Sequence, residues 1–548
     1  MLLDALKENL SFDAVPSAAN MWRNMLAFRQ AISHSSNMRS VVHSLILITM
    51  TALLSSLAQP AFPQENPLGE FGAHTDVGDP KLAGSASYDT ALQEYTLTGA
   101  GSNMWVGRDE FQFVWKKMTG DFILRTRVEF IGKGAVDHRK IGWMVRPSLE
   151  ADAPYADCAR HGVTLTSLQF RRSKGGATEQ IVLPITNADV LQFERKGSNF
   201  IFSAAHYGEP FVSGQLTNLD LGDEVYAGLY ICSHSSNVIE KAVFRDVRII
   251  KPARTNFVPY RDYIGSVLEV LDVQSGRLEV ISSSSQPIEA PNWTRDGEAL
   301  IYNVSGRAAG WGALCRFDLA TKKATVMDTG QARQNNNDHV LSFDGTRLGI
   351  SDQSAFHGGQ SAVFTVPVGG GTPTPVTRLS PSYLHGWSPD GKFLVYAGVR
   401  SNKFDIYKMS SDGTGPEIRL TDAVGVNDGP EYTPDGKYIY FNSSRSGLMQ
   451  LWRMKPDGQD QEAVTHDEYN NWFPHISPDG KWIAFVSFSG EIAPGEHPYY
   501  KQVYLRLMPA GGGPARVIAY VYGGQGTMNV PSWSPDSRRI AFVSNSGM

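Results

Sequence analysis

Three histidines occupy matching places in the second half of the chain, where acidic and amide residues accompany them. His339, His385 and His475 each stand four or five residues ahead of an aspartate in a short turn motif. Imidazole and carboxylate groups together can bind a divalent metal ion or act as general acid and base, whereas amides and acids also suit sugar hydroxyls. The candidate ligand-binding residues are His339, His385, His475, Asp338, Asp428, Glu431 and Asn471, and the three histidines are the candidate metal ligands.

The turn motif near these residues occurs six times and sets the frame that positions them. It reads TRDG, SFDG, SPDG, TPDG, SPDG and SPDS, and successive aspartates are 48, 46, 45, 44 and 57 residues apart. Pro presets the backbone of such a turn, and Gly accepts a positive φ. Apolar runs such as KFLVYAG and KWIAFVS follow, and this period with short strands is typical of β-propeller blades. The turn aspartates are Asp296, Asp344, Asp390, Asp435, Asp479 and Asp536.

The sixth repeat is incomplete, because the chain stops at Met548 after two expected strands. Residues 266–282, SVLEVLDVQSGRLEVIS, form a lone predicted hairpin before the first full repeat. Pairing of this hairpin with the C-terminal strands would close the ring and remove its exposed edges. The sequence therefore predicts a six-bladed β-propeller over residues 265–548.

The repeats resemble a known family. HGWSPDGKFLVYAG, GPEYTPDGKYIYFNSSRSGLMQLWRMKPDG and NNWFPHISPDGKWIAFVS are similar to TolB-type propeller repeats, and such propellers serve as scaffolds, binders or enzymes. The region also distantly resembles oligogalacturonate lyases, which implies channel histidines that hold a metal and a basic residue as proton acceptor. Only the histidines match that pattern, and for Arg445 a salt bridge to a neighbouring blade is the favoured interpretation.

The segment ahead of each turn is expected to be the innermost strand of its blade, with one edge facing the central channel. Proline stands five residues before the turn aspartate in four repeats, whereas His339 and His385 replace it in two. An edge strand tolerates proline because no partner needs its N–H. All six strands run the same way, so their starts gather at one channel mouth. Neighbouring strand residues point to opposite faces, so the one-residue offset of His475 makes His339 and His385 the safer pair.

The first half of the chain lacks these repeats. Residues 66–252 contain many strand candidates, such as DFILRTRVEFI and KIGWMVRPSL, and little helix. The layout resembles the concanavalin-like jelly-roll β-sandwiches found beside carbohydrate-active domains, and residues 253–264 would be the linker. A polar group between Asp137 and Arg172 could face a sugar, but solvated loops and structural ion pairs are favoured.

The N-terminus predicts export. Residues 38–58 combine a basic start, a short apolar run and small residues before a cleavage point, as a signal peptide does. Met38 would then be the start, residues 1–37 an upstream extension, and the mature protein periplasmic or secreted, with no other stretch apolar enough to span a membrane. The net charge of −5 is small for this length and Lys and Arg are dispersed, so nothing points to a nucleic-acid groove and no nucleic-acid partner is expected. Cys158 and Cys232 could pair, or both could be free buried thiols.

Two functions from different classes follow. The first is an exported protein that binds or processes carbohydrate, with a glycan as partner and a divalent metal ion as a candidate cofactor. The alternative is a non-catalytic, TolB-like envelope scaffold that binds another protein. Enzymatic activity is left open: an enzyme would be a glycan lyase or hydrolase. No G-x-S-x-G, H-E-x-x-H or P-loop motif occurs. Histidines that converge in a closed pocket favour the first function, and histidines turned into blade packing favour the second.

Overall fold

A computed structural model describes residues 66–163, 165–305, 312–354 and 358–547. The predicted upstream extension and signal peptide lie outside these residues. Within them the secondary structure is strands and turns with no α-helix, which confirms the predicted all-β class. A search of the same residues for a long apolar helix able to cross a membrane finds none.

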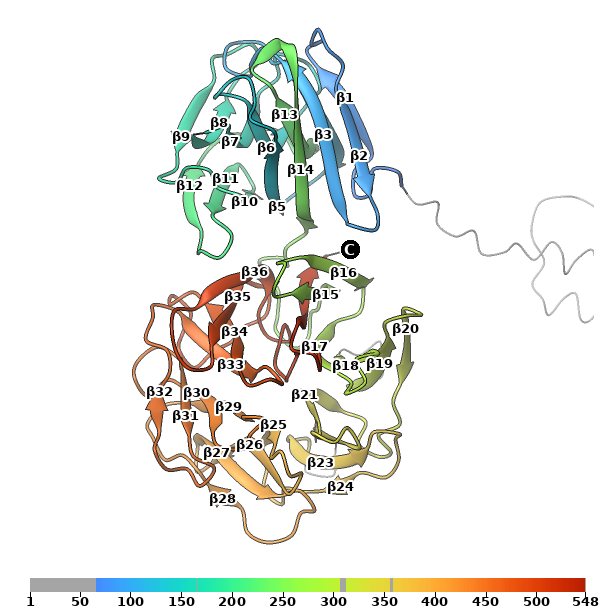
Figure 1. Cartoon of the computed structure of the whole chain (residues 1–548), viewed down its shortest axis with the longest axis vertical. Helices are drawn as coiled ribbons and strands as arrows, with labels where there is room; N and C mark the ends of the chain where they lie inside the picture. The colour runs from blue at the N-terminus through green and yellow to red at the C-terminus, as the bar shows by residue number, and fades with distance from the viewer. Residues whose placement is uncertain (1–65, 164, 306–311, 355–357, 548) are drawn as a thin grey trace, which may run out of the picture. The chain divides into compact units, whose positions relative to one another are not determined.

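The strands of residues 73–250 form two seven-stranded antiparallel sheets (Figure 1). The first sheet has the order β1 (Ala73–Val77), β4 (Phe111–Met118), β13 (Val225–Cys232), β6 (Lys140–Arg146), β7 (Tyr155–His161), β8 (Thr166–Arg171) and β9 (Glu179–Val182). The second has the order β12 (Val212–Leu216), β11 (Asn199–Ala205), β10 (Val190–Lys196), β5 (Phe122–Ile131), β14 (Ser235–Ile250), β3 (Glu94–Gly101) and β2 (Ser85–Asp89). Their shared core includes Trp143, Leu168, Phe193 and Leu229.

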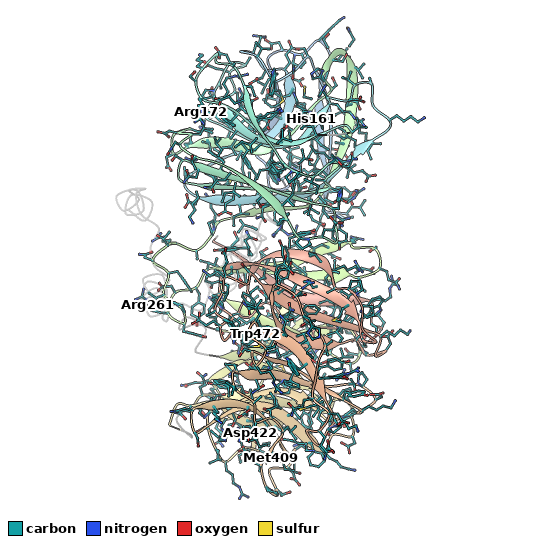
Figure 2. All side chains as sticks on the ribbon, turned by 90° about the vertical axis from the view of Figure 1, so that its left-hand side faces the viewer. His161, Arg172, Arg261, Met409, Asp422 and Trp472 are labelled. Carbon is teal, nitrogen blue, oxygen red and sulfur yellow. The ribbon has the colours of Figure 1, made fainter. Side chains whose placement is uncertain are left out.

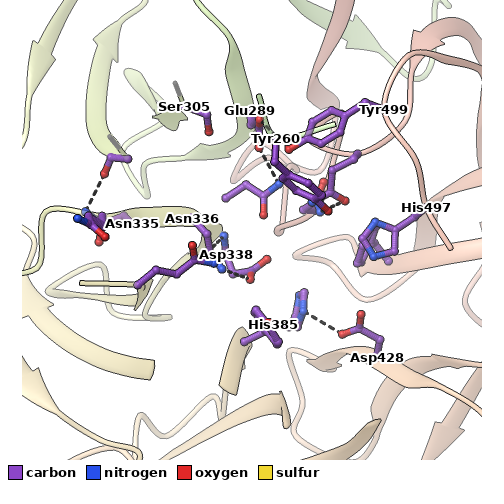
Figure 3. A pocket seen from close by; sticks show the side chains of 18 of the residues that line it. Tyr260, Glu289, Ser305, Asn335, Asn336, Asp338, His385, Asp428, His497 and Tyr499 are labelled. Atoms are coloured by element: carbon purple, nitrogen blue, oxygen red, sulfur yellow. Dashed lines mark hydrogen bonds and ion pairs between the residues drawn. The ribbon is translucent and has the colours of Figure 1, made fainter. Parts of the chain in front are cut away.

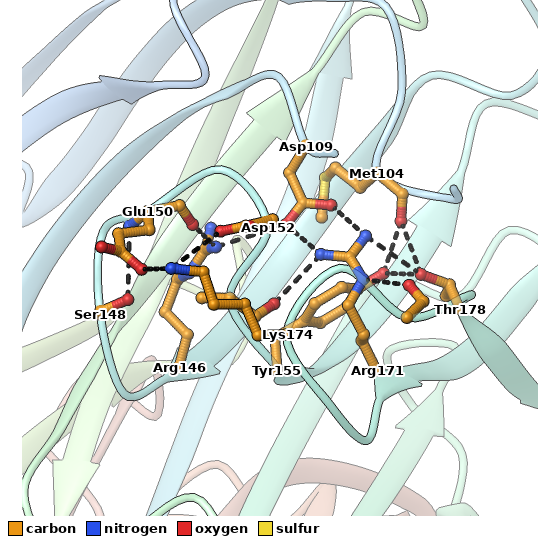
Figure 4. A network of polar contacts seen from close by, with 12 residues as sticks. Met104, Asp109, Arg146, Ser148, Glu150, Asp152, Tyr155, Arg171, Lys174 and Thr178 are labelled. Carbon is orange, nitrogen blue, oxygen red and sulfur yellow. Dashed lines mark hydrogen bonds and ion pairs between the residues drawn. The ribbon is translucent and has the colours of Figure 1, made fainter. Parts of the chain in front are cut away.

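A buried ion network crosses the outer face of the first sheet (Figure 4). Arg171 donates from Nη2 to Oδ1 of Asp109 at 2.6 Å and from Nη1 to Oδ2 at 2.8 Å, and Arg146 Nη2 lies 3.3 Å from Oδ2. All three side chains are fully buried. These two arginines of the predicted polar group therefore form structural ion pairs. Cys158 and Cys232 are free, buried thiols.

The remaining strands form the six blades of a propeller (Figure 1). Five blades are four-stranded antiparallel sheets whose strands follow in chain order from the channel outward. The first blade contains β17 (Ile288–Trp293), β18 (Ala299–Val304), β19 (Ala313–Asp318) and β20 (Lys323–Val326), and the second contains β21 (Asn335–Leu341), β22 (Arg347–Asp352), β23 (Ala362–Pro367) and β24 (Thr374–Pro375). The third contains β25 (Ser382–Trp387), β26 (Phe393–Arg400), β27 (Lys403–Ser410) and β28 (Ile418–Arg419), and the fourth contains β29 (Asn427–Tyr432), β30 (Ile439–Ser443), β31 (Gln450–Met454) and β32 (Glu462–Ala463). The fifth contains β33 (Asn470–Ile476), β34 (Trp482–Phe488), β35 (Lys501–Pro509) and β36 (Arg516–Gly523).

The sixth blade joins the two ends of the propeller region. It contains β16 (Leu278–Ser284), β15 (Gly265–Asp272) and β37 (Arg539–Ser546), with β15 in the middle. The β15–β37 ladder runs from Gly265 opposite Ser546 to Asp272 opposite Arg539, which confirms the predicted closure. In the described residues the innermost strand of this blade is reduced to one bridge between Trp533 and Ile540.

Hydrogen bonds inside the repeated turn explain its residue types. In every repeat the Ser or Thr two residues before the aspartate donates its hydroxyl hydrogen to Oδ1 of that aspartate. The same Oδ1 accepts from the backbone N–H two residues later, as from Lys481 to Asp479 at 3.1 Å. A hydrogen bond between blades also holds this segment: Trp387 Nε1 donates to the Val340 carbonyl of the preceding blade at 2.8 Å. Each turn therefore fixes where its inner strand ends.

A β-bulge interrupts the inner strand of all five four-stranded blades. The pairing with the second strand shifts at matching positions in the first, fourth and fifth blades, as between Glu289 and Asn292. In the second blade it shifts between Asn335 and His339, and in the third between Leu384 and Gly386. Ala290 and Phe473, each six residues before its turn aspartate, have φ values of 55° and 54°. Bulges redirect side chains, so simple alternation does not hold along these strands.

Candidate functional site

A pocket of about 580 Å³ lies where the inner strands of the propeller begin (Figure 3). The repeated turns follow the ends of the same strands, so they lie at the opposite end of the channel. We call this pocket the mouth pocket. Its described lining residues are Tyr260, Tyr263, Glu289, Ser305, Gly312, Gln334, Asn335, Asn336, Asn337, Asp338, Gln353, Gly359, Tyr383, His385, Phe404, Asp428, Phe473, His497, Tyr499, Gln525 and Asn529.

One register position supplies much of the lining. In five of the six repeats, the residue seven positions before the turn aspartate lines the mouth pocket. The remaining equivalent residue, Trp472, packs in a blade core and is fully buried. Figure 2 labels its place in the propeller. Later positions line the pocket in only some blades, as Asp338, His385 and Phe473 do. The five lining residues are Glu289, Asn337, Tyr383, Asp428 and Asn529.

Two segments outside the inner strands contribute rings to the mouth pocket. Tyr260 and Tyr263 come from segment 253–264, and His497 and Tyr499 come from the loop between β34 and β35. The rings of Tyr260 and Tyr499 meet edge to face with centroids 5.4 Å apart, and Tyr263 contacts Tyr499 at 6.1 Å. Residues 253–264, predicted only as a linker, therefore also supply part of the pocket wall.

His385 and Asp428 form an ion pair in the mouth pocket, with Nε2 3.1 Å from Oδ1. Burial by itself would lower the pKa of His385, but the hydrogen bond and charge of Asp428, aided by Asp338, raise it above its ordinary value. Burial would likewise raise the pKa of Asp428, yet the His385 partner holds it below the usual range. Each partner therefore favours the charged form of the other.

Two further carboxyl groups in the mouth pocket form no ion pair with a cationic side chain of the described residues. Glu289 accepts hydrogen bonds from Asn337 Nδ2 at 2.8 Å and from Tyr499 at 3.2 Å, and burial raises its pKa to about 7. Asp338 accepts one from Asn336 Nδ2 at 2.9 Å, and burial raises its pKa to about 6. No lysine or arginine is among the described lining residues. The mouth pocket therefore carries excess negative charge when both carboxyls ionise.

The structure separates the residues that the sequence grouped into one site. Asp338, His385 and Asp428 line the mouth pocket, whereas His339, His475, Glu431 and Asn471 are buried outside its described lining. His475 Nδ1 lies 2.7 Å from Glu431 Oε2, and its Nε2 lies 3.2 Å from the Met528 carbonyl.

Two of the displaced residues pack between strands. His339 Nε2 lies 3.2 Å from the Ile301 carbonyl, and burial lowers the pKa of this imidazole to about 4. Asn471 bonds with Asp467 at 2.9 Å and Ser487 at 2.7 Å. These four side chains thus hold the blades together.

The three histidines do not share a metal site in this geometry. Each contacts a different partner, and the described residues contain no group of three or more His, Cys, Asp or Glu side chains placed to hold a metal ion. The place of the bulge differs between these blades: His385 has no partner in the register with its second strand and lines the pocket, whereas His339 pairs with Ile350 and His475 with Ala484. Arg445, for which a salt bridge was favoured, instead hydrogen-bonds to Asn427 and Gln461 within its own blade.

Sequence reasoning missed Glu289, His497, Tyr499 and the tyrosines of segment 253–264. Glu289 could have been found by aligning the repeats, because it stands seven residues before its turn aspartate, the same position that Asp428 occupies in its repeat. The long final spacing of 57 residues would have pointed to the inserted loop that carries His497 and Tyr499. Nothing in the repeats signals Tyr260, because it precedes the first blade.

Comparisons with known proteins agree with the fold. A family model described as the TolB beta propeller domain matches residues 381–494. The uncharacterized protein Atu1656 of Agrobacterium fabrum is 44% identical over 279 residues, which cover 51% of this chain and 92% of that protein. The chain belongs to the TolB-like β-propeller family.

Two solved structures are similar to this TolB-like protein. One, from Agrobacterium tumefaciens and described as a candidate TolB, is 43% identical, with a TM-score of 0.49 over 52% of this chain and 100% of that one. The other, TolB from Acinetobacter baumannii, is 18% identical, with a TM-score of 0.37 over 48% of this chain and 64% of that one.

Proposed function

We propose that this TolB-like protein is a non-catalytic periplasmic binding protein whose mouth pocket holds a segment of another envelope protein. The observation that carries the proposal is the mouth pocket itself, in which the imidazole of His385 and the carboxyl of Glu289 are already held by other side chains of the chain. Asp428 pairs with His385, and Glu289 accepts from Asn337 and Tyr499. Two of the three candidate histidines are buried in blade packing. This arrangement favours recognition over chemistry.

The size and lining of the mouth pocket suit the end or a side chain of a polypeptide. Its volume of about 580 Å³ falls in the range of specific ligand sites. Tyr260 is 66% exposed at this pocket, and tyrosine is enriched at protein interfaces because one side chain offers apolar and hydrogen-bonding surface. The predicted signal peptide and the TolB-like family support a place in the periplasm.

Binding of an oligosaccharide is a second candidate for the same mouth pocket. Amide side chains of Asn335, Asn336, Asn337 and Asn529 line it together with aromatic rings. Amides and rings suit sugar hydroxyls and sugar faces. The excess of carboxyl groups would disfavour acidic glycans, so a neutral glycan is the form this candidate takes.

Affinity capture with matched variants tests the proposed function. Three proteins would be exposed to periplasmic extract of the source organism: the mature chain (residues 59–548, after the predicted signal peptide), its Tyr260→Ala variant and its Lys481→Ala variant. Lys481 is exposed beside a turn at the opposite end of the channel. A polypeptide retained by the mature chain and Lys481→Ala, lost by Tyr260→Ala and bound again as a purified protein would support the proposal. Equal retention by all three, or retention of only a glycan, would contradict it.

A further inference from the structure

We infer that the group recognised in the mouth pocket is a cation: the ammonium or guanidinium of a lysine or arginine side chain, or a free amino terminus. This inference rests on the proposed function, since it names the chemistry by which the mouth pocket would hold a partner segment. It is carried by unbalanced charge, by a free carboxylate oxygen and by the surrounding aromatic rings. Figure 3 shows the carboxyls of Glu289 and Asp338 and the ring of Tyr499 in the pocket.

The charges of the mouth pocket do not balance without a ligand. Glu289, Asp338 and Asp428 line it, and the described lining contains neither lysine nor arginine. His385 is committed to Asp428, and burial lowers the pKa of His497, the other lining histidine, which keeps its ring neutral. Glu289 and Asp338 therefore form no ion pair in the described part of the chain, although the charge of His385 also attracts Asp338. Buried charges are normally paired, so a ligand cation would complete the site.

Asp338 shows where such a cation would bind. Its side chain is only 5% exposed, yet it lines the mouth pocket. Asn336 Nδ2 donates to Oδ2 at 2.9 Å, and no described donor reaches Oδ1. A buried carboxylate oxygen left open toward a pocket can accept a charge-assisted hydrogen bond from an ammonium or guanidinium group.

Aromatic rings stand around the unpaired carboxyls. Tyr260, Tyr263 and Tyr499 pack edge to face beside Glu289, whose carboxylate accepts from Tyr499. On another side, Tyr383 and Phe404 stack with centroids 6.0 Å apart and planes 11° apart. Ring faces attract cations. Carboxylates combined with ring faces select a positive group over a neutral one and repel anions such as phosphate.

Four peptide probes that differ in charge test the inference on the mature chain. Three carry a cation: acetyl-Gly-Lys-Gly-amide, acetyl-Gly-Arg-Gly-amide, and Gly-Ala-Gly-amide with a free amino terminus. The fourth, acetyl-Gly-norleucine-Gly-amide, replaces the lysine by a neutral side chain of similar length. Ligand-observed NMR titration detects weak binding at probe concentrations up to about 10 mM. Comparison of the first three identifies which source of positive charge the mouth pocket prefers.

A double variant, Glu289→Gln with Asp338→Asn, removes both unpaired charges at nearly constant volume. Loss of a charge-assisted hydrogen bond lowers affinity by about 10-fold or more. The matched control, Glu462→Gln with Asp460→Asn, removes two exposed acids on an outer blade edge. We expect at least one cationic probe to bind the mature chain and the control variant with equal affinity. The same probe should bind the double variant about 10-fold more weakly. The norleucine probe should bind the mature chain more weakly than that cationic probe.

Equal affinity for the norleucine and lysine probes, failure of every cationic probe to bind, or unchanged binding by a folded double variant would overturn the inference. These results separate it from the proposed function. A partner polypeptide whose capture depends on Tyr260, together with failure of all cationic probes, would refute the cation and leave the proposed function standing. Tight binding of cationic probes without any polypeptide partner would refute the proposed function and leave the recognition of a cation standing.

Discussion

His385 and Asp428 face each other from neighbouring blades, with Nε2 of the imidazole 3.1 Å from Oδ1 of the carboxylate. The two residues occupy positions five and seven before their turn aspartates. One belongs to the expected histidine series and the other to the register position that lines the mouth pocket. Their contact shows how the bulged inner strands bring residues from adjacent blades together.

Asp428→Asn should lower the pKa of His385 and destabilise the fold most where that imidazole is protonated. A raised His pKa stabilises the native state below its unfolded value, and this contribution is lost as pH rises through the folded value. We expect a loss of about 2–4 kcal/mol of unfolding free energy near pH 6 and less at about pH 9. NMR titration of the ring and urea unfolding measure both effects. An unchanged imidazole pKa would show that the pair does not form.

Glu289→Gln and Asp338→Asn should each stabilise the protein in mildly alkaline solution. A carboxyl pKa raised by burial, to about 7 for Glu289 and about 6 for Asp338, favours the native state at low pH, and this contribution is lost as pH rises through the folded value. We expect gains of about 1–3 kcal/mol near pH 8 that shrink toward pH 5. Unfolding in urea at both pH values checks this. Destabilisation near pH 8 would mean that these carboxylates support the fold.

Binding of the acetylated lysine probe should weaken as pH falls from about 8 to about 5, because Glu289 and Asp338 take up protons in that range. The other titratable groups at the pocket are Asp428, His385, His497 and the lining tyrosines. Protonation of His497 would repel the probe further at low pH. Binding near pH 7 should release protons, which calorimetry in buffers of different ionisation enthalpy detects. Affinity independent of pH would contradict recognition by these carboxyls.

His475→Ala should destabilise the propeller without weakening probe binding. The substitution removes a buried ring and leaves the Glu431 carboxylate with only the Ile476 N–H as a described donor. We expect a loss of about 2–4 kcal/mol in urea unfolding. Under conditions where the variant is folded, NMR titration with the lysine probe should give the same affinity for the variant as for the unsubstituted mature chain. A large loss of affinity in the folded variant would place His475 in the site after all.

Asp109→Asn should destabilise the β-sandwich strongly, because it leaves the buried, charged side chains of Arg146 and Arg171 beside a neutral amide in place of their shared carboxylate. Removing one partner of a buried ion network costs about 3–5 kcal/mol. Asp152→Asn is the control, since the Asp152 side chain is 41% exposed and should change stability by less than about 0.5 kcal/mol. Thermal unfolding followed by circular dichroism compares them. Equal midpoints would contradict the importance of the network.

The propeller could be predicted well because its signals are local. The Ser or Thr, Asp and Gly of each turn bond to one another within a few residues, as in Ser477 to Asp479. The closure of the ring also followed from a simple count of strands. β15 pairs with β37, although some 270 residues separate them. This pairing was predictable because the hairpin at one end has a free edge and the last blade lacks strands, so pairing the two removes both exposed edges.

The site was harder to predict because it depends on backbone irregularity. Alignment of the repeats placed His339 and His385 at the mouth alike, but their strands are bulged at different positions, and His339 Nε2 lies against the Ile301 carbonyl instead. A positive φ at Phe473 likewise has no signal in the residue type. Tyr260 reaches the mouth pocket from outside the repeats. Such contributions follow from three-dimensional closure and cannot be read from spacing.

Site-specific photo-crosslinking in cells of the source organism tests the central claim most directly. A photoreactive amino acid would replace Tyr260 at the mouth pocket and, in a matched strain, Lys481 at the opposite end of the channel. The proposed function predicts a crosslinked envelope polypeptide from position 260 only, whose crosslink is competed away by the purified partner segment. Crosslinks from position 481 alone, or none from position 260, would contradict binding at the mouth.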